Sequence, residues 1–244
     1  NKICVSIIAV PAFITSVQFS ATLLFVVVSM CIGLIPMETI CWSTLRSCIL
    51  YVAMFVLSIY ANMKTLQYNN VDTIIVFRCC SPIIVGISEW LCMDREFMSF
   101  RSCMALTGVL LFAVLYVYTE DAFHTHGVSA YTWAITYMVL VSIEMVYGKH
   151  IVNPRIEYDS QWGPVLYTNM IATLPMFTIA ILTEEYEQIL AIKYKQRHVI
   201  LPLMLSCVAG ISISYYGWKC RSMLSATSYT VIGVMNKILT IIMN

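Results

Sequence analysis

Long stretches without a charged residue recur along the chain and constrain its fold more than any other feature. They cover residues 3–37, 47–63, 102–119, 122–143, 160–183 and 198–218. Most of them match the roughly 20 apolar residues needed to cross a hydrocarbon core about 30 Å thick. Of all residues, 60% are hydrophobic and only 11% are charged, which is outside the balance of a soluble domain. The sequence therefore predicts an all-α polytopic membrane protein.

Nine helices account for this pattern. Pro11 divides the first charge-free stretch, and two further apolar stretches are interrupted by a single cation, Arg78 or Lys237. The predicted helices are a remnant at 1–9, then 12–34, 44–65, 71–92, 101–119, 128–149, 161–183, 198–218 and 224–244. Because the chain begins with Asn1 and ends within an apolar run, we expect both outer helices to be incomplete.

The basic residues of the predicted loops indicate an orientation. Alternate loops lie on opposite sides of the membrane. The loops on one side carry seven basic residues, and the loops on the other side carry four. The first set is Arg46, Arg95, Arg101, Lys149, Arg155, Lys219 and Arg221, and the second is Lys64, Lys193, Lys195 and Arg197. The positive-inside rule places the first set in the cytosol. With a net charge of +1 and no basic face, the chain is not expected to bind nucleic acid.

Neither a metal site nor an enzyme active site stands out. The ten cysteines are scattered through apolar segments without C-x-x-C spacing, as packing residues are. His124 and His126 follow Glu120 and Asp121, but such residues at a membrane edge are more often solvated than metal-bound. No nucleophile lies beside a base and no catalytic carboxylate pair is evident. We expect neither catalysis nor a cofactor.

Arg78 and Lys237 lie in otherwise apolar helices, where an unpaired cation at mid-depth costs roughly 3 kcal/mol or more. Their helices are five apart and so run in opposite directions, as corresponding members of an inverted repeat do. In one interpretation the two cations pair with neighbouring carboxylates and fix packing. In the other they face an aqueous cavity that receives an anionic substrate. Glu89 and Glu144 either reach the interface or form a proton or ion site.

Polar and aromatic residues in two helices suit a nucleotide joined to a sugar. In helix 161–183, Tyr167 offers a ring that stacks on a purine, and Asn169 offers an amide for a base edge. The last helix adds Ser228, Tyr229, Gly233, Asn236 and Lys237. Lysine suits phosphate oxygens, asparagine suits hydroxyls, and glycine lets the backbone approach a ligand closely.

Two short motifs in these helices resemble those of a known family. Residues 233–237, G-V-M-N-K, resemble the G-A-L-N-K motif of Golgi GDP-mannose transporters, and residues 166–169, L-Y-T-N, resemble their F-Y-N-N motif. Further similarity runs through residues 57–64, 70–78 and 201–207. Together these segments are most similar to the plant-type branch of Golgi GDP-sugar transporters, in the drug/metabolite transporter superfamily.

This resemblance implies a ten-helix fold of two inverted five-helix repeats. About nine helices are represented, with the first repeat in 1–119 and the second in 120–244, where the tenth helix is absent. The resemblance also implies that a cavity opens alternately to the cytosol and the Golgi lumen and exchanges cytosolic GDP-sugar for GMP. It further implies a location in the Golgi membrane. Other members of the family form homodimers through their terminal helices, which we expect to be incomplete here, so a homodimer does not carry over directly.

The family's site residues carry over with one departure. Tyr167 and Asn169 would recognise the guanine end, while Gly233, Asn236 and Lys237 would line the sugar and phosphate end. Thr168 replaces the first asparagine of the family's pair and loses the amide's paired donor and acceptor, which leaves guanine selectivity open. Another anionic substrate, such as a UDP-sugar or a sugar phosphate, is the alternative. A multi-helix receptor is the less favoured one, because nine spans are too many.

The role of Arg78 is open at this stage. It either shares the phosphate or pairs with Asp72 or Glu89. Asp72 lies six residues away, nearly two helical turns, so direct pairing along the helix is poor.

Overall fold

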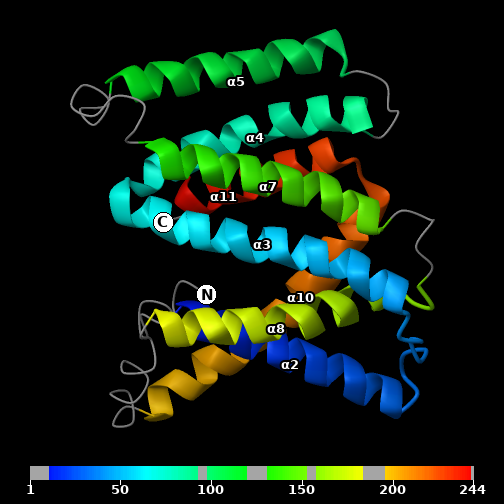
Figure 1. Ribbon diagram of the computed structural model, residues 1–244. Helices are drawn as coiled ribbons and strands as arrows, with labels where there is room; N and C mark the ends of the chain where they lie inside the picture. The colour runs from blue at the N-terminus through cyan, green and yellow to red at the C-terminus, as the bar shows by residue number, and fades with distance from the viewer. Residues whose placement is uncertain (1–10, 93–97, 120–130, 153–157, 184–195, 243–244) are drawn as a thin grey trace. The chain divides into compact units, whose positions relative to one another are not determined.

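The computed structural model describes residues 11–92, 98–119, 131–152, 158–183 and 196–242, and its eight elements are all α-helices (Figure 1). They are α2 (Pro11–Cys31), α3 (Trp42–Tyr68), α4 (Val71–Cys92), α5 (Phe100–Thr119), α7 (Thr132–Ile151), α8 (Gly163–Leu182), α10 (Gln196–Met223) and α11 (Ala226–Ile242). Each corresponds to one predicted helix, so the all-α prediction is confirmed for these ranges. The predicted remnant at 1–9 lies outside the described residues.

Of the eight helices in the described ranges, six are long and apolar enough to span a membrane: α2, α3, α4, α5, α8 and α10. The chain is therefore a polytopic membrane protein. Two other predicted spans, α7 and α11, are not among the six. Helix α7 carries Glu144 and Lys149, and α11 has 17 residues, which corresponds to about 25 Å of helix. That α7 and α11 also cross the membrane stays a prediction.

Local sequence explains where several helices begin and end. Gly33 has a φ of +76°, which glycine adopts without strain, and its N–H bonds the Met30 carbonyl at 3.1 Å beyond the last residue of α2. Pro164 lies in the first turn of α8, where a missing N–H costs nothing. Ser225 precedes α11 and accepts the Ser228 N–H at 3.0 Å through its hydroxyl, as a helix cap does.

The chain forms two compact units, each built from both halves of the sequence. The first unit comprises residues 1–52 and 151–222, and the second comprises residues 53–150 and 223–244. Each unit thus contains segments from both predicted repeats, 1–119 and 120–244. The compact units are therefore a different division from the repeats, and the inverted-repeat relationship stays a prediction.

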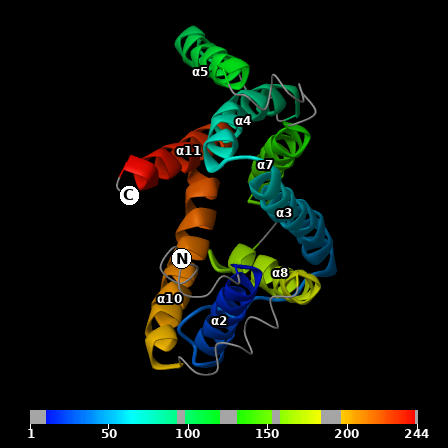
Figure 2. The same ribbon diagram turned by 90° about the vertical axis from the view of Figure 1, so that its left-hand side faces the viewer.

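In the first unit, α2 and α8 run side by side (Figure 1 and Figure 2). Both helices bury small or slender apolar residues, which lets two membrane helices approach closely. The buried residues include Ala12, Ile14 and Val26 of α2 and Val165, Ala172 and Met176 of α8. The rings of Phe13 and Phe177 meet edge to face with centroids 6.4 Å apart.

The end of α10 differs from the prediction. The predicted helix stops at 218, whereas α10 continues to Met223 and includes Arg221, which was expected in a loop. Arg221 is buried: its Nη1 donates to the Tyr51 hydroxyl at 2.5 Å and its guanidinium lies 4.9 Å from the Trp218 ring centroid. These two contacts of Arg221 stabilise the helix beyond the end of the apolar stretch at 218.

In the second unit, α4 contacts both α5 and α11. A small core of Ala61, Ile74, Tyr137 and Val141 joins α3, α4 and α7. Helix α5 buries none of its residues in this structure. Residues of three helices in this unit, α4, α7 and α11, line a small cavity.

Candidate functional site

The second unit contains a small cavity of about 200 Å³ lined by three helices. Arg78 of α4, Val141 and Met145 of α7, and Tyr229, Thr230, Ile232, Gly233 and Asn236 of α11 line it. Four of these were predicted as site residues from the sequence alone: Arg78, Tyr229, Gly233 and Asn236. The fold thus brings together residues about 150 positions apart in the chain.

Arg78 is half-buried at this cavity and is held by a neutral partner. Its Nη1 donates a hydrogen bond of 2.6 Å to the Tyr137 hydroxyl on α7. Within the described ranges no carboxylate forms an ion pair with it, and neither Asp72 nor Glu89 is its partner. A guanidinium has five N–H donors, so most of its donors remain for another acceptor.

Lys237 follows Asn236 on α11 and is exposed. Its ammonium lies close enough to the Arg78 guanidinium for the two charges to repel one another. Among the residues that the structure describes, it forms no ion pair with a carboxylate. Two like charges without a counter-charge make this region favourable for an anion.

Ser228 does not line the cavity. Its exposed hydroxyl accepts a hydrogen bond from the Ser225 hydroxyl at 2.9 Å in the first turn of α11. The structure therefore places this predicted site residue at the helix cap. Its role in substrate binding stays a prediction.

Glu89 fixes the beginning of α11, and sequence reasoning did not identify this role. The carboxylate is buried on α4 and accepts the backbone N–H groups of Ala226 and Thr227 at 2.8 and 2.9 Å. Its Oε2 also accepts the Thr227 hydroxyl at 2.6 Å. A negative charge at a helix N-terminus satisfies free N–H groups and complements the helix dipole. An acidic residue near the end of an apolar helix was the only signal in the sequence.

The predicted guanine site lies in the first unit, where its side chains are buried. Tyr167 is 1% exposed, and its hydroxyl donates to the Thr39 carbonyl at 3.0 Å and accepts the Cys41 N–H at 2.8 Å. The Thr168 hydroxyl donates to the Pro164 carbonyl of its own helix at 2.6 Å. Asn169 likewise donates through Nδ2 to Val165 at 2.7 Å. In this structure these polar groups serve the protein itself, so their part in base recognition stays a prediction.

Two acidic residues bind the α2–α3 loop to the segment before α8. Asp159 accepts the Thr39 N–H at 3.0 Å and the Thr39 hydroxyl at 3.1 Å, while Glu38 accepts the Asp159 N–H at 3.1 Å. Burial raises the pKa of the Glu38 carboxyl above its ordinary value, although hydrogen bonds from Asp159 and Ser160 oppose this. Its second oxygen, Oε2, is buried without a hydrogen-bond partner.

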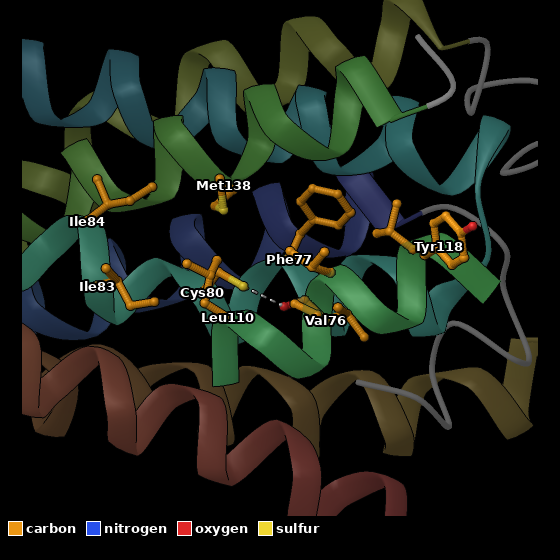
Figure 3. A pocket seen from close by; sticks show the side chains of 11 residues that line it. Val76, Phe77, Cys80, Ile83, Ile84, Leu110, Tyr118 and Met138 are labelled. Atoms are coloured by element: carbon orange, nitrogen blue, oxygen red, sulfur yellow. Dashed lines mark hydrogen bonds between the residues drawn. The ribbon is translucent and has the colours of Figure 1, made fainter. Parts of the chain in front are cut away.

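A larger cavity in the second unit cannot serve an anion. It measures about 470 Å³ and lies among α4, α5 and α7. Figure 3 shows mostly carbon and sulfur on the side chains around it, among them Phe77, Cys80 and Met138, while the labelled Tyr118 carries a hydroxyl oxygen. Phosphate oxygens would lose their hydration here without gaining donors. The smaller cavity is the better candidate despite its size.

The sequence also singled out Glu144, His124 and His126. Glu144 is buried on α7 and accepts the Ser58 hydroxyl at 3.2 Å. The described residues contain no group of three potential metal ligands. His124 and His126 lie outside the described residues.

Comparisons with known proteins place the chain among nucleotide-sugar carriers, although no family model matches it. It is 33% identical over 250 residues to GDP-fucose transporter 1 of Arabidopsis thaliana, covering all of this chain and 72% of that protein. It is 33% identical over 252 residues to the GDP-mannose transporter GONST3 of the same plant, covering all of this chain and 66% of that protein. The identity to a GDP-mannose transporter of Kluyveromyces lactis is 21% over 188 residues, or 75% of this chain and 57% of that transporter.

The six candidate spans are those of a multi-pass membrane protein. The similarity to two plant transporters over the whole chain defines it further. The chain belongs to the GDP-sugar transporter family. It is a nucleotide-sugar transporter and not an enzyme, and the resemblance seen in its motifs is confirmed.

Proposed function

We propose that the protein carries a GDP-sugar, GDP-mannose or a related GDP-hexose, into the Golgi lumen in exchange for GMP. Family membership supports the class of substrate. The cavity of the second unit supports the presence of an anionic ligand, because it combines Arg78 with Gly233 and Asn236 of the G-V-M-N-K segment. The activity of a whole transporter is proposed because the chain spans 72% and 66% of the two plant relatives.

The observation that carries the proposal is a pair of cations: Arg78, which lines this cavity, and Lys237, which is not among its lining residues but interacts electrostatically with Arg78. Arg78 uses one donor on Tyr137, and Lys237 is near enough to repel it. An anion between them would replace this repulsion by two favourable interactions, and arginine and lysine both bind phosphate oxygens well. We therefore assign the diphosphate to Arg78 and Lys237.

The volume of the cavity indicates which part of the ligand it takes. Sites for ligands of ordinary drug size occupy roughly 300–1,000 Å³, and this cavity measures about 200 Å³. It suits one end of a nucleotide sugar better than the whole molecule. Asn236 offers an amide to sugar hydroxyls, and Gly233 presents no side chain. We assign the sugar and phosphate end to this cavity.

The assignment of residues to the guanine end of the substrate rests on the family resemblance. Tyr167 and Asn169 occupy the positions of the F-Y-N-N motif, with Thr168 in place of the first asparagine. Both are buried in this structure, so the proposal requires another conformation in which a base reaches them. Alternating access supplies such conformations by exposing different surfaces in turn.

The same charges explain coupling between uptake and return. Two neighbouring cations without a carboxylate partner are unfavourable within a membrane when no substrate is bound. Bound nucleotide compensates them, so the loaded carrier reorients faster than the empty one. Exchange follows without another energy source. We further propose the drug/metabolite transporter fold of two inverted five-helix repeats and a homodimer for the complete protein.

Liposome exchange tests the proposal directly. Purified protein is placed in vesicles loaded with GMP, and uptake is measured for GDP-, UDP- and CMP-sugars. We expect uptake of a GDP-sugar alone, and loss of it in Lys237→Ala with normal amounts of folded protein. Lys219→Ala is the matched control, because this exposed lysine lies on α10 over the Tyr215 ring. Full exchange by Lys237→Ala would contradict the phosphate assignment, and uptake of a UDP-sugar instead would favour the alternative substrate.

A further inference from the structure

Tyr137 is the described residue that holds Arg78 in place. Its hydroxyl accepts a hydrogen bond of 2.6 Å from Arg78 Nη1, and it was not among the site residues predicted from the sequence. We propose that Tyr137 is a positioning residue that orients the Arg78 guanidinium toward the phosphate end of the substrate. This inference rests on the proposed function of the same cavity.

The hydroxyl oxygen of Tyr137 has a fixed position. Tyr137 is 5% exposed, and its ring packs in the core formed with Ala61, Ile74 and Val141. Three helices supply these neighbours, so the ring cannot move without disturbing α3, α4 and α7. The acceptor oxygen is therefore rigid, whereas the arginine side chain carries several rotatable bonds.

The long cationic side chain of Arg78 needs a rigid anchor such as the Tyr137 hydroxyl. Arginine has a flexible side chain that loses rotamer freedom on binding, and its planar fork binds phosphate well only in the right orientation. A bond at one terminal nitrogen removes much of this freedom before the ligand arrives. Preorganisation of this kind strengthens binding by reducing the entropy lost at that moment.

The Tyr137 hydroxyl that anchors Arg78 is neutral. A carboxylate at the position of the tyrosine hydroxyl would neutralise Arg78 and compete with phosphate for its donors. A neutral hydroxyl orients the guanidinium and leaves its positive charge for the substrate. Arg78 forms no ion pair with a carboxylate among the described residues, which agrees with this role.

Glu144 supplies negative charge at a greater distance. It lies seven residues after Tyr137 on α7, is buried, and is close enough to interact electrostatically with the tyrosine. The Ser58 hydroxyl on α3 donates to it at 3.2 Å. The carboxylate is thus bonded to Ser58, and the Tyr137 hydroxyl is the side-chain partner of Arg78.

The test measures inhibition of exchange by GDP and by guanosine, which lacks phosphate. In Tyr137→Phe we expect the concentration of GDP for half inhibition to rise about tenfold, the order of one hydrogen bond to a charged group. Inhibition by guanosine should not change. The matched control is Tyr116→Phe, which removes another tyrosine hydroxyl bonded to α4, at Thr73, but none at Arg78.

A double-mutant cycle tests whether the effect passes through Arg78. In an Arg78→Gln background, Tyr137→Phe should have no further effect on GDP inhibition, because independent sites would add. Arg78→Lys gives the same information if Tyr137→Phe does not fold: it keeps the charge and loses the fork, so GDP inhibition should weaken to a similar extent.

Four outcomes overturn the inference. They are unchanged GDP inhibition in Tyr137→Phe, equal weakening for GDP and guanosine, full additivity with Arg78→Gln, or full GDP inhibition in Arg78→Lys. In each of these the wild-type protein is still inhibited by GDP, so the proposed function stands. A wild-type protein that GDP does not inhibit would overturn the proposed function and this inference together.

Discussion

Glu89 on α4 caps α11 by accepting both the N–H and the hydroxyl of Thr227, at 2.9 and 2.6 Å. The same carboxylate accepts the Ala226 N–H, so the first turn of α11 is tied to a neighbouring helix. Helix α11 carries the cavity residues Gly233 and Asn236 two to three turns further on. The orientation of the candidate site therefore depends on a residue that does not line it.

Glu89→Ala should destabilise the protein by about 1–3 kcal/mol, because three buried or half-buried donors lose a charged acceptor. Thermal unfolding in detergent measures the loss. Ser88→Ala is the control, since the Ser88 hydroxyl bonds only the Ile84 carbonyl of its own helix at 2.8 Å. Equal unfolding temperatures for Glu89→Ala and Ser88→Ala would show that the cap contributes nothing.

The sequence predicted the helices well because each is a local pattern. Apolar stretches of about 20 residues predicted nine helices, and eight of these ranges correspond to the observed helices, with ends that differ by a few residues. Helix α10 is the largest departure, since it continues five residues past the predicted end at 218. Its extension depends on contacts between Arg221 and Tyr51, which lie 170 residues apart and which no local pattern reveals.

The candidate site was predictable only in part. A cation in an apolar helix is conspicuous, so Arg78 and Lys237 were found, and the motif supplied Gly233 and Asn236. Tyr137 and Glu89 were missed because each acts on a residue of another helix. The burial of Tyr167 was equally hidden, since it depends on backbone atoms of Thr39 and Cys41 more than 120 residues away.

Gly233→Ala separates a binding effect from a folding effect. A Cβ at this position would meet no other atom within 4 Å, so the added methyl group enters the cavity without a clash. Alanine also favours the helix by up to about 1 kcal/mol relative to glycine. We expect stability to be equal or greater and exchange of a GDP-sugar to fall about tenfold or more, because the methyl group occupies ligand space.

Gly108→Ala is the matched control for Gly233→Ala. Gly108 lies in α5, has equally open surroundings, and does not line the cavity. Its exchange rate should equal that of the wild-type protein. Normal exchange by Gly233→Ala would show that the substrate does not approach this backbone.

Cys41 should react faster than an ordinary thiol. It is exposed before α3, and hydrogen bonds from the Ser43 hydroxyl and the Ser43 and Thr44 N–H groups lower the pKa of its thiol. The thiolate is the reactive form. Ser43→Ala should raise this pKa and slow maleimide modification near pH 7, as measured by mass spectrometry of the modified peptide. Ser47→Ala should leave the rate unchanged, because the Ser47 hydroxyl bonds the Ser43 carbonyl and not the thiol.

Glu38 makes the stability of the first unit depend on pH. Burial favours its neutral form and raises the pKa of its carboxyl in the folded protein. Asp159 faces it and repels its charge, while Tyr158 and Tyr167 also lie within electrostatic range. Phenols stay neutral below a pH of about 10, so Asp159 is the charged neighbour that matters.

The sign of this pH dependence follows from the raised pKa. Above the ordinary glutamate value the folded state binds more protons than the unfolded state, so stability falls as the pH rises through the folded-state pKa and is highest below the unfolded one. Glu38→Gln keeps an acceptor for the Asp159 N–H and removes the titrating charge. We expect its unfolding temperature to change less with pH than that of the wild-type protein and to exceed it near pH 7. The comparison needs only thermal unfolding of both proteins between pH 4 and 8. A wild-type protein that becomes more stable with rising pH, in parallel with Glu38→Gln, would show that Glu38 is ionised at no cost and that its buried Oε2 has found a partner.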